Sequence, residues 1–150
     1  MPEKLLEYND DLTEAFVGRR IVKAELGVDR PSVSDEVESE ESWRDSLDGT
    51  EPYGRLTLDD DTVIYLVGND GGCACSAGCY SLTHLAEVDN IITSVKVVDL
   101  HAGEDDDADE GKYQIFVVTE AEELKIAEFE GSDGNGYYGT GFHLLVKTAA

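Results

Sequence analysis

Long apolar runs, basic residues and cysteines are all scarce in this sequence of 150 residues. The longest apolar runs, such as TVIYLV at 62–67, are too short to cross a membrane. The start MPEKLLEYNDD lacks the basic and apolar parts of a secretory signal. Three cysteines in a chain without an export signal argue against a disulfide scaffold. We therefore expect a soluble cytoplasmic protein whose cysteines are reduced thiols or metal ligands.

The shortage of basic residues excludes a whole class of partners. Against 34 Asp and Glu there are 11 Lys and Arg, which gives a formal net charge of −23. Nucleic-acid binding needs clustered Lys and Arg, so direct binding to DNA or RNA is excluded. An acidic protein associates fastest with basic surfaces, so a protein partner with a basic surface is expected. There are two alternative explanations of the acidity: the charge only keeps the protein soluble, or the surface mimics DNA.

Two acidic stretches hold much of this charge, an excursion at 28–52 and a loop at 103–111. Blocks of like charge usually stay solvated, so both are predicted to be loops between strands. Trp43, the single tryptophan, lies inside the first stretch and either anchors it on the core or is displayed to a partner. The candidate partner-binding residues of this stretch are Trp43, Glu38, Glu40, Glu41 and Asp45.

The remaining sequence alternates as β-strands do. The segment 53–70 is predicted to be a hairpin that turns at Asp59, Asp60 and Asp61, with a return strand at 62–67 that is apolar on both faces and therefore central. The other predicted strands are 19–26, with Val22, Ala24 and Leu26 on one face, 91–100, 113–119, 123–131 and 141–147.

Helix is predicted at the start alone, where Leu5, Leu12 and Phe16 are spaced by seven and four after Pro2. The expected fold class is mainly β (α+β). It is a single antiparallel β-sheet or a small β-sandwich or meander, with one or two short N-terminal helices and acidic loops. One domain spans 1–150, because no linker or internal repeat divides the chain.

The three cysteines lie within seven residues of a glycine-rich segment, GGCACSAGCYSLTH at 71–84. Cys73, Cys75, Cys79 and His84 are the ligand types of a tetrahedral zinc site, although their spacing is not that of a common zinc module. A tight structural turn over 71–79 that brings the cysteines together is our main interpretation, with zinc as the alternative cofactor. A catalytic cysteine would need an electropositive setting, which this acidic chain does not offer.

A second glycine-rich segment, GSDGNGYYGTGF at 131–142, superficially resembles a phosphate-binding loop. A strand-like sequence follows it where a helix would be needed, and the lysine of a P-loop is absent. Its Asp, Asn and Gly residues suit a tight hairpin turn instead. Tyr137 and Tyr138 on this hairpin are candidate partner contacts.

The stretches LVGNDGGCACSAGCYSL, DNIITSVKVVD and GSDGNGYYGTGFHLLVK together resemble a family of small uncharacterised proteins encoded by phages of actinobacteria and by related prophages. The likeness covers about residues 53–147 and leaves out the acidic excursion. It implies a β-rich fold, a phage or prophage origin and a place in the host cytoplasm or on the virion. It carries no catalytic residue to this chain.

No complete catalytic motif is found in the sequence. The expected function is therefore that of a non-enzymatic accessory protein that binds a host factor or a phage assembly component. A DNA mimic that inhibits a DNA-binding host protein is the first alternative. The second alternative is a small zinc-binding or thiol-dependent enzyme that uses the cysteine segment. The oligomeric state cannot be derived from these residues.

Overall fold

The computed structural model describes residues 3–7, 10–29, 50–68, 77–101, 111–134 and 141–148. The prediction of a mainly β fold is confirmed, because strands dominate these residues and one helix of four residues accompanies them. The helix is α1 (Thr13–Phe16). The strands are β1 (Glu3–Glu7), β2 (Ile21–Val28), β3 (Thr50–Leu58), β4 (Val63–Gly68), β5 (Ala77–Leu85), β6 (Ser94–His101), β7 (Gly111–Val118), β8 (Glu123–Gly134) and β9 (Phe142–Lys147).

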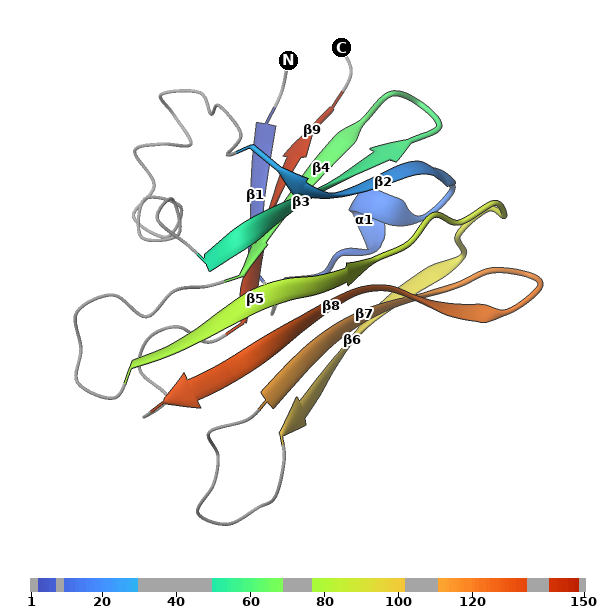
Figure 1. Cartoon of the computed structure of the whole chain (residues 1–150). Helices are drawn as coiled ribbons and strands as arrows, with labels where there is room; N and C mark the ends of the chain where they lie inside the picture. Colours follow the sequence, from blue (N-terminus) through green and yellow to red (C-terminus); the bar gives the residue numbers. More distant parts are fainter. Residues whose placement is uncertain are drawn as a thin grey trace.

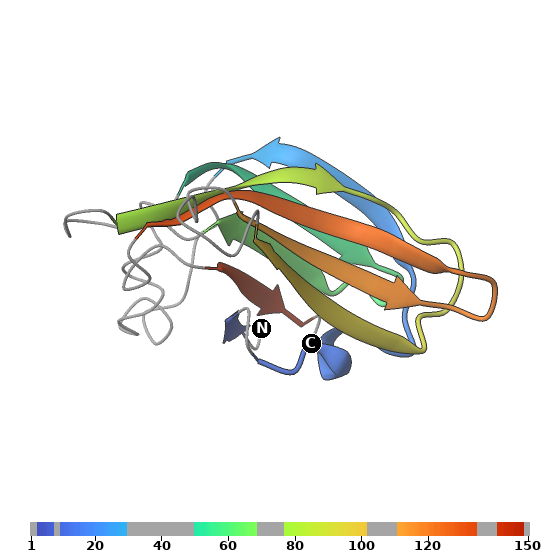
Figure 2. The same ribbon diagram turned by 90° about the horizontal axis from the view of Figure 1, so that it is seen from below.

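The strands form two antiparallel sheets that pack around a common core (Figures 1 and 2). Sheet A has the order β1-β9-β4-β3-β2, and sheet B has the order β5-β8-β7-β6. Within each sheet three consecutive strands form a meander, β2-β3-β4 in sheet A and β6-β7-β8 in sheet B. The last strand, β9, enters sheet A between β4 and β1, so the first and last strands of the chain lie beside each other (Figure 1).

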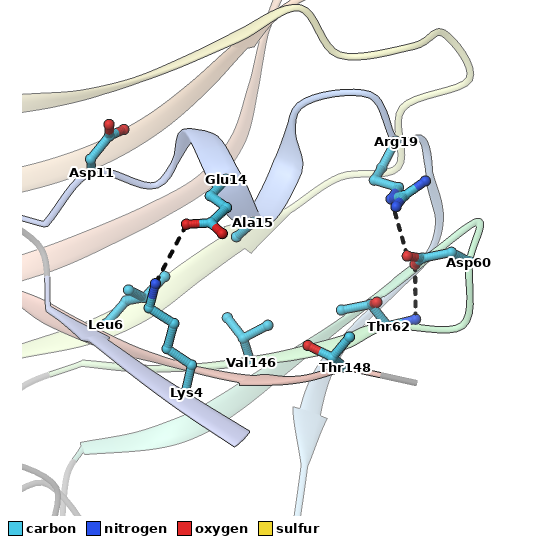
Figure 3. A pocket seen from close by; sticks show the side chains of 10 residues that line it. All are labelled: Lys4, Leu6, Asp11, Glu14, Ala15, Arg19, Asp60, Thr62, Val146 and Thr148. Carbon is cyan, nitrogen blue, oxygen red and sulfur yellow. Dashed lines mark hydrogen bonds and ion pairs between the residues drawn. The ribbon is translucent and has the colours of Figure 1, made fainter. Parts of the chain in front are cut away.

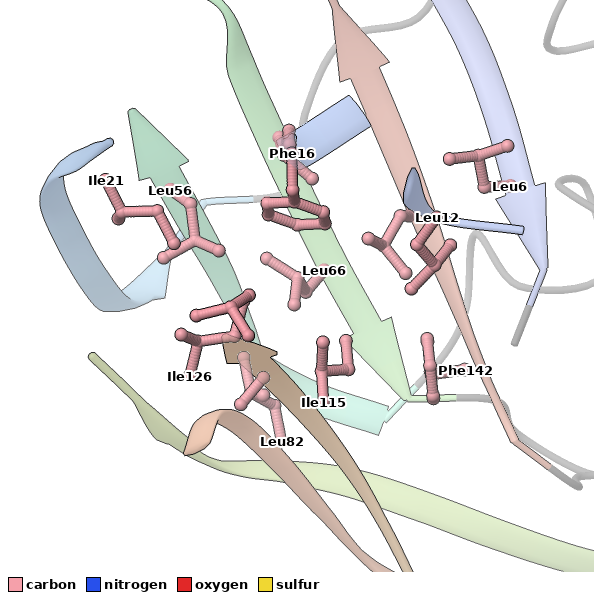
Figure 4. Close-up of a cluster of buried hydrophobic side chains, with 14 of the residues drawn as sticks. Leu6, Leu12, Phe16, Ile21, Leu56, Leu66, Leu82, Ile115, Ile126 and Phe142 are labelled. Carbon is pink, nitrogen blue, oxygen red and sulfur yellow. The ribbon is translucent and has the colours of Figure 1, made fainter. Parts of the chain in front are cut away.

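The core lies between the sheets and takes side chains from both of them (Figure 4). Ring stacking joins the sheets, since Phe129 of β8 lies parallel to Phe142 of β9 with 4.5 Å between ring centroids. Helix α1 adds Phe16, which is fully buried, and the preceding Leu12. Burial of large apolar side chains stabilises a fold by roughly 1.5–3 kcal/mol each, so this shared core is what holds the two sheets together.

Strand β4 occupies the centre of sheet A, as its sequence predicts. It pairs with β3 on one side and with β9 on the other, and Ile64 and Leu66 are fully buried. The predicted hairpin of β3 and β4 is also confirmed, with Asp61 at its turn in a left-handed conformation, φ 71°. Asp tolerates this conformation because its short polar side chain can bond locally.

The single sheet, one of the predicted alternatives, is wrong, and so is the prediction that helix begins at Pro2 and includes Leu5. The chain has two sheets, and Glu3–Glu7 is an edge strand paired with β9. Leu12 and Phe16 are buried as the helical spacing suggests, but the helix itself is confined to Thr13–Phe16. The physical reason is that β1 gains backbone hydrogen bonds from a strand about 140 residues away, which local spacing cannot reveal.

The assignment of faces in β2 needs a correction as well. Val22, Ala24 and Leu26 were expected on one face. Ala24 and Leu26 do share a face, since no register shift separates them, but Val22 is 52% exposed and Ile21 is buried with the core instead. The β2–β3 register shifts twice, between Ile21 and Lys23 and between Leu26 and Val28. A β-bulge inserts one residue and so changes which side chains face the core.

The turn predicted at 71–79 is wrong for its last three residues, 77–79. Residues 77–85 form β5, an edge strand of sheet B whose Tyr80 and Leu82 are buried, while residues 71–76 lie outside the described residues. Ala and Gly have weak strand preference, so a strand that begins at Ala77 and Gly78 does not stand out in the sequence. Pairing with β8 supplies the hydrogen bonds that make it a strand.

Candidate functional site

The structure describes two of the four proposed zinc ligands. Cys79 and His84 both lie on β5, where their register partners on β8 are Ser132 and Glu128. Cys73 and Cys75 lie outside the described residues. Within the described ranges, no group of three or more His, Cys, Asp or Glu side chains is placed to hold a metal ion.

The proposed partner-binding residues also lie outside the part of the chain that the structure describes. They are Glu38, Glu40, Glu41, Trp43 and Asp45 in the acidic excursion and Tyr137 and Tyr138 in the late glycine-rich segment. Among the described residues, no helix is long and apolar enough to span a membrane.

A hollow of about 240 Å³ lies between α1, β1, the β3–β4 turn and the end of β9 (Figure 3). Apolar side chains from three elements contribute to its wall, Leu6, Ala15 and Val146. Two ion pairs stand on opposite sides of it: Lys4 Nζ lies 3.7 Å from Glu14 Oε2, and Arg19 Nε lies 3.0 Å from Asp60 Oδ2. The other lining residues are Asp11, Thr62 and Thr148.

Asp60 is the most strongly held carboxylate of this hollow. Its Oδ1 accepts a hydrogen bond from the backbone N–H of Thr62 at 3.1 Å, and its Oδ2 contacts Arg19. Burial acts to raise the pKa of Asp60, but the hydrogen bonds from Thr62 and the charge of Arg19 outweigh it and the pKa is lowered. The hollow therefore keeps its negative charge at neutral pH.

The face of sheet A that is turned away from the core carries a cation–aromatic cluster. Arg55 donates two hydrogen bonds to Glu25, from Nε to Oε1 at 3.0 Å and from Nη2 to Oε2 at 2.8 Å. Arg55 and Lys147 both approach the ring of Tyr65, with 5.9 and 5.6 Å to its centroid. The hydrogen bonds to Glu25, and then the contact with Tyr65, raise the pKa of Arg55, while the pKa of Glu25 is lowered by the bond from Arg55.

The corresponding face of sheet B centres on a nearly buried carboxylate, Glu128, which is 8% exposed. Its Oε2 accepts hydrogen bonds from Gln114 Nε2 at 2.6 Å and from Lys125 Nζ at 2.9 Å. The hydrogen bond from Lys125 is the main reason that the pKa of Glu128 is lowered, with Gln114 adding to it against the effect of burial. This arrangement links β7 and β8 on this face of the sheet.

We expect Glu128→Gln to lower the free energy of unfolding at pH 7 by roughly 1–2 kcal/mol, because a charge-assisted hydrogen bond is lost. Folding lowers the pKa of Glu128, so its stabilisation is complete above about pH 4.3, the value of a free glutamate, and is lost as pH falls through the folded-state pKa. Urea unfolding of both proteins from pH 7 to pH 3 should therefore show a difference that shrinks in acid.

The matched control is Glu130→Gln on the same strand. Glu130 lies 3.5 Å from Lys112 and both side chains are about half exposed, so its loss should cost roughly 0–1 kcal/mol. Using the difference between variant and wild type matters here, because acid also relieves self-repulsion in so acidic a protein. A Glu128 difference that stays constant down to pH 3 would contradict the assignment.

Sequence reasoning did not find the hollow or the two clusters. Glu25 and Arg55 lie thirty residues apart and meet because they are register partners in β2 and β3. The hollow is built from α1, two strands and a turn that are distant in the chain. The usable signal was local: Asp60 and Thr62 stand two residues apart in the predicted hairpin turn, a spacing at which Asp bonds the backbone N–H.

Comparison with known proteins gives one match. A family model described as a domain of unknown function (DUF7448) matches residues 14–144, from α1 to the middle of β9. No curated protein matches the chain, and no solved structure matches it.

Proposed function

Since the chain belongs to the DUF7448 family of unknown function, we propose from its charge and geometry that it is a non-enzymatic accessory protein that binds a protein partner through the partner's basic surface. The resemblance to phage and prophage proteins supports a phage-type role in the host cytoplasm, with a host factor or a phage assembly component as the partner.

The observation that carries this proposal is how the basic side chains are used. Seven described Lys and Arg side chains each lie within 4.0 Å of a carboxylate: Lys4, Arg19, Lys23, Arg55, Lys96, Lys112 and Lys125. Most of the described cations are thus engaged within the protein, and the large surplus of carboxylates gives the molecule its external field. Such a field raises the rate of encounter with a positively charged surface.

The hollow beside α1 supports the same function. Its apolar wall can contact the aliphatic stem of a lysine or arginine, while Asp11, Glu14 and Asp60 at its rim attract the charged end. Glu14 is 90% exposed and pairs with Lys4 at 3.7 Å, so a cation from a partner can compete for it. We propose this hollow as an anchor for one basic side chain of the partner.

Affinity capture from the bacterial host, followed by kinetics with the captured protein, tests this function. Association should slow markedly from low to physiological salt, because charges more than about 8–10 Å apart are largely screened at 0.15 M. Neutral isosteres at Glu38, Glu40, Glu41 and Asp45 should weaken binding and leave the melting temperature unchanged or slightly higher.

A second set of substitutions with the same change of charge controls for the field of the whole protein. Glu87, Asp89, Glu120 and Glu122 are exposed and far in sequence from the acidic excursion. If both sets slow association equally, diffuse charge steers the encounter; a larger effect of the first set assigns the contact to the excursion. Binding that ignores salt and both sets would contradict the proposal, and competition by duplex DNA would identify a DNA mimic.

A further inference from the structure

Four strands lie at sheet edges, and in three of them pairing is short or irregular. β1 has five residues, the β2–β3 register shifts twice, and the β5–β8 register shifts between Leu82 and His84. Short strands and bulges are the devices by which proteins protect an edge from pairing with another chain. These three edges are therefore poor templates for an added strand.

β6 is different. All eight of its residues, Ser94–His101, pair with β7 without a register shift, and β6 forms the outer edge of sheet B (Figures 1 and 2). No strand of the described residues pairs with its outer side. It contains no proline and a single lysine, Lys96, which is already paired with Glu123. A regular strand of this length offers alternate N–H and C=O groups to an extended peptide.

The side chains of β6 indicate what such a peptide should look like. Val95 and Val97 face the core, since their register partners on β7, Val117 and Ile115, are fully buried, yet both valines are only partly buried themselves. Every second side chain of an added strand would cover Val95 and Val97. The side chains between would lie with Lys96 on the solvent face, so the fitting sequence alternates apolar and polar residues.

Charge selects between the two candidate occupants of this edge. Pairing β6 with β6 of a second copy would bring together two chains that each carry −23, whereas a basic segment would be attracted. The sequence that joins β6 to β7, residues 102–110, alone holds six acidic residues, Glu104, Asp105, Asp106, Asp107, Asp109 and Glu110. Repulsion thus disfavours self-association at this edge, whereas a partner of opposite charge is attracted to it.

We propose that β6 binds an extended basic segment of the partner protein, which adds a fifth strand to sheet B with apolar side chains toward Val95 and Val97 and basic side chains toward solvent. The inference rests on the proposed function and adds the place and form of the contact.

The test uses the full chain and a blocked seven-residue peptide of alternating Val and Lys. Amide hydrogen exchange followed by NMR should slow about tenfold or more at alternate residues of β6 when the peptide is saturating, and not in β2. The control is the same peptide N-methylated at alternate residues, which keeps the charge but cannot complete the ladder. Protection of β6 amides by both peptides, or by neither, would overturn the proposal.

A pair of proline variants of the protein tests the same surface, with the unmodified peptide as the ligand. Neighbouring residues of an edge strand point their N–H groups alternately toward the paired strand and outward. Of the two variants Val97→Pro and Val98→Pro, one therefore loses a hydrogen bond to β7 and the other loses an outward-pointing donor. The variant that retains the wild-type melting temperature should bind the peptide about tenfold more weakly. Unchanged binding by that variant would contradict the inference, as would a wild-type dimer in sedimentation that the variant abolishes.

The two proposals can fail separately. If a captured partner binds with the expected salt dependence but ignores the stable proline variant, the β6 contact is wrong and the proposed function stands. If the peptide pairs with β6 while no partner shows salt-dependent binding, the edge is real and the proposed function is wrong.

Discussion

Gly68→Ala is expected to be among the most destabilising single-methyl additions in this protein. Gly68 ends β4, and a Cβ at this position would overlap the backbone carbonyl of Tyr80 on β5 and lie 3.1 Å from the backbone nitrogen of Ser81. Because backbone cannot move aside as a side-chain end can, β4 and β5 would have to separate. We expect a loss of roughly 3 kcal/mol or more.

Thermal unfolding measures this effect, and two other glycines provide the scale. For a chain of this size 1 kcal/mol corresponds to roughly 2–4 °C, so the melting temperature should fall by about 10 °C. At Gly54 a Cβ would meet the ends of Leu82 and Leu85, with 2.6 Å to Leu85 Cδ1, and these can shift for roughly 1–2 kcal/mol.

The third glycine separates backbone strain from close approach. Gly27 has open space around its Cβ position but φ +89°, so alanine there should cost roughly 1–2 kcal/mol through strain alone. The expected order of destabilisation is therefore Gly68 first, with Gly54 and Gly27 well behind. Equal melting temperatures for the Gly68 and Gly27 variants would show that β4 and β5 are not in the contact described.

Ile64→Asp should unfold much of the protein at neutral pH. Ile64 is fully buried in the central strand of sheet A, and its register partners Leu56 and Val146 are buried and apolar. No described neighbour in this register can pair with a carboxylate, so the cost should be about 4–5 kcal/mol or more. Native domains are stable by only about 5–15 kcal/mol, and a loss of this size removes most of that margin.

Val63→Asp is the matched control on the same strand. Val63 is partly exposed on the opposite face of sheet A, where Lys147 is its register partner, so a carboxylate there can remain solvated and near a cation. Urea unfolding should show near-wild-type stability for Val63→Asp and a collapse for Ile64→Asp. Similar values for the two variants would mean that β4 does not present Ile64 to the core.

Burial should also make the Ile64→Asp defect depend on pH. A buried carboxyl has a raised pKa, so the folded variant binds a proton more readily than the unfolded chain, and its stability falls as pH rises from about 3.9 through that raised value. The defect relative to wild type should therefore be smaller near pH 4 than at pH 7.

Most of the candidate surfaces could not be predicted from the sequence, because each depends on register or on contacts between distant segments. The acidity and the resulting choice of a basic partner follow from composition and do not require a fold. The hollow requires α1 to lie against the ends of β1 and β9, and the open edge requires β6 to be last in sheet B. Neither condition leaves a pattern in a single stretch of residues.

The sequence by itself determined the strand character and the β3–β4 hairpin, since alternation and turn residues act locally. It also indicated that β4 is central, which its pairing with β3 and β9 confirms, although Val63 and Tyr65 on its outer face are only partly buried. Tertiary structure decided that Glu3–Glu7 and Ala77–Leu85 are strands, because their strand form depends on pairing with β9 and β8. It also decided the faces of β2, because a bulge changes the side-chain alternation and its position is set by the neighbouring strand.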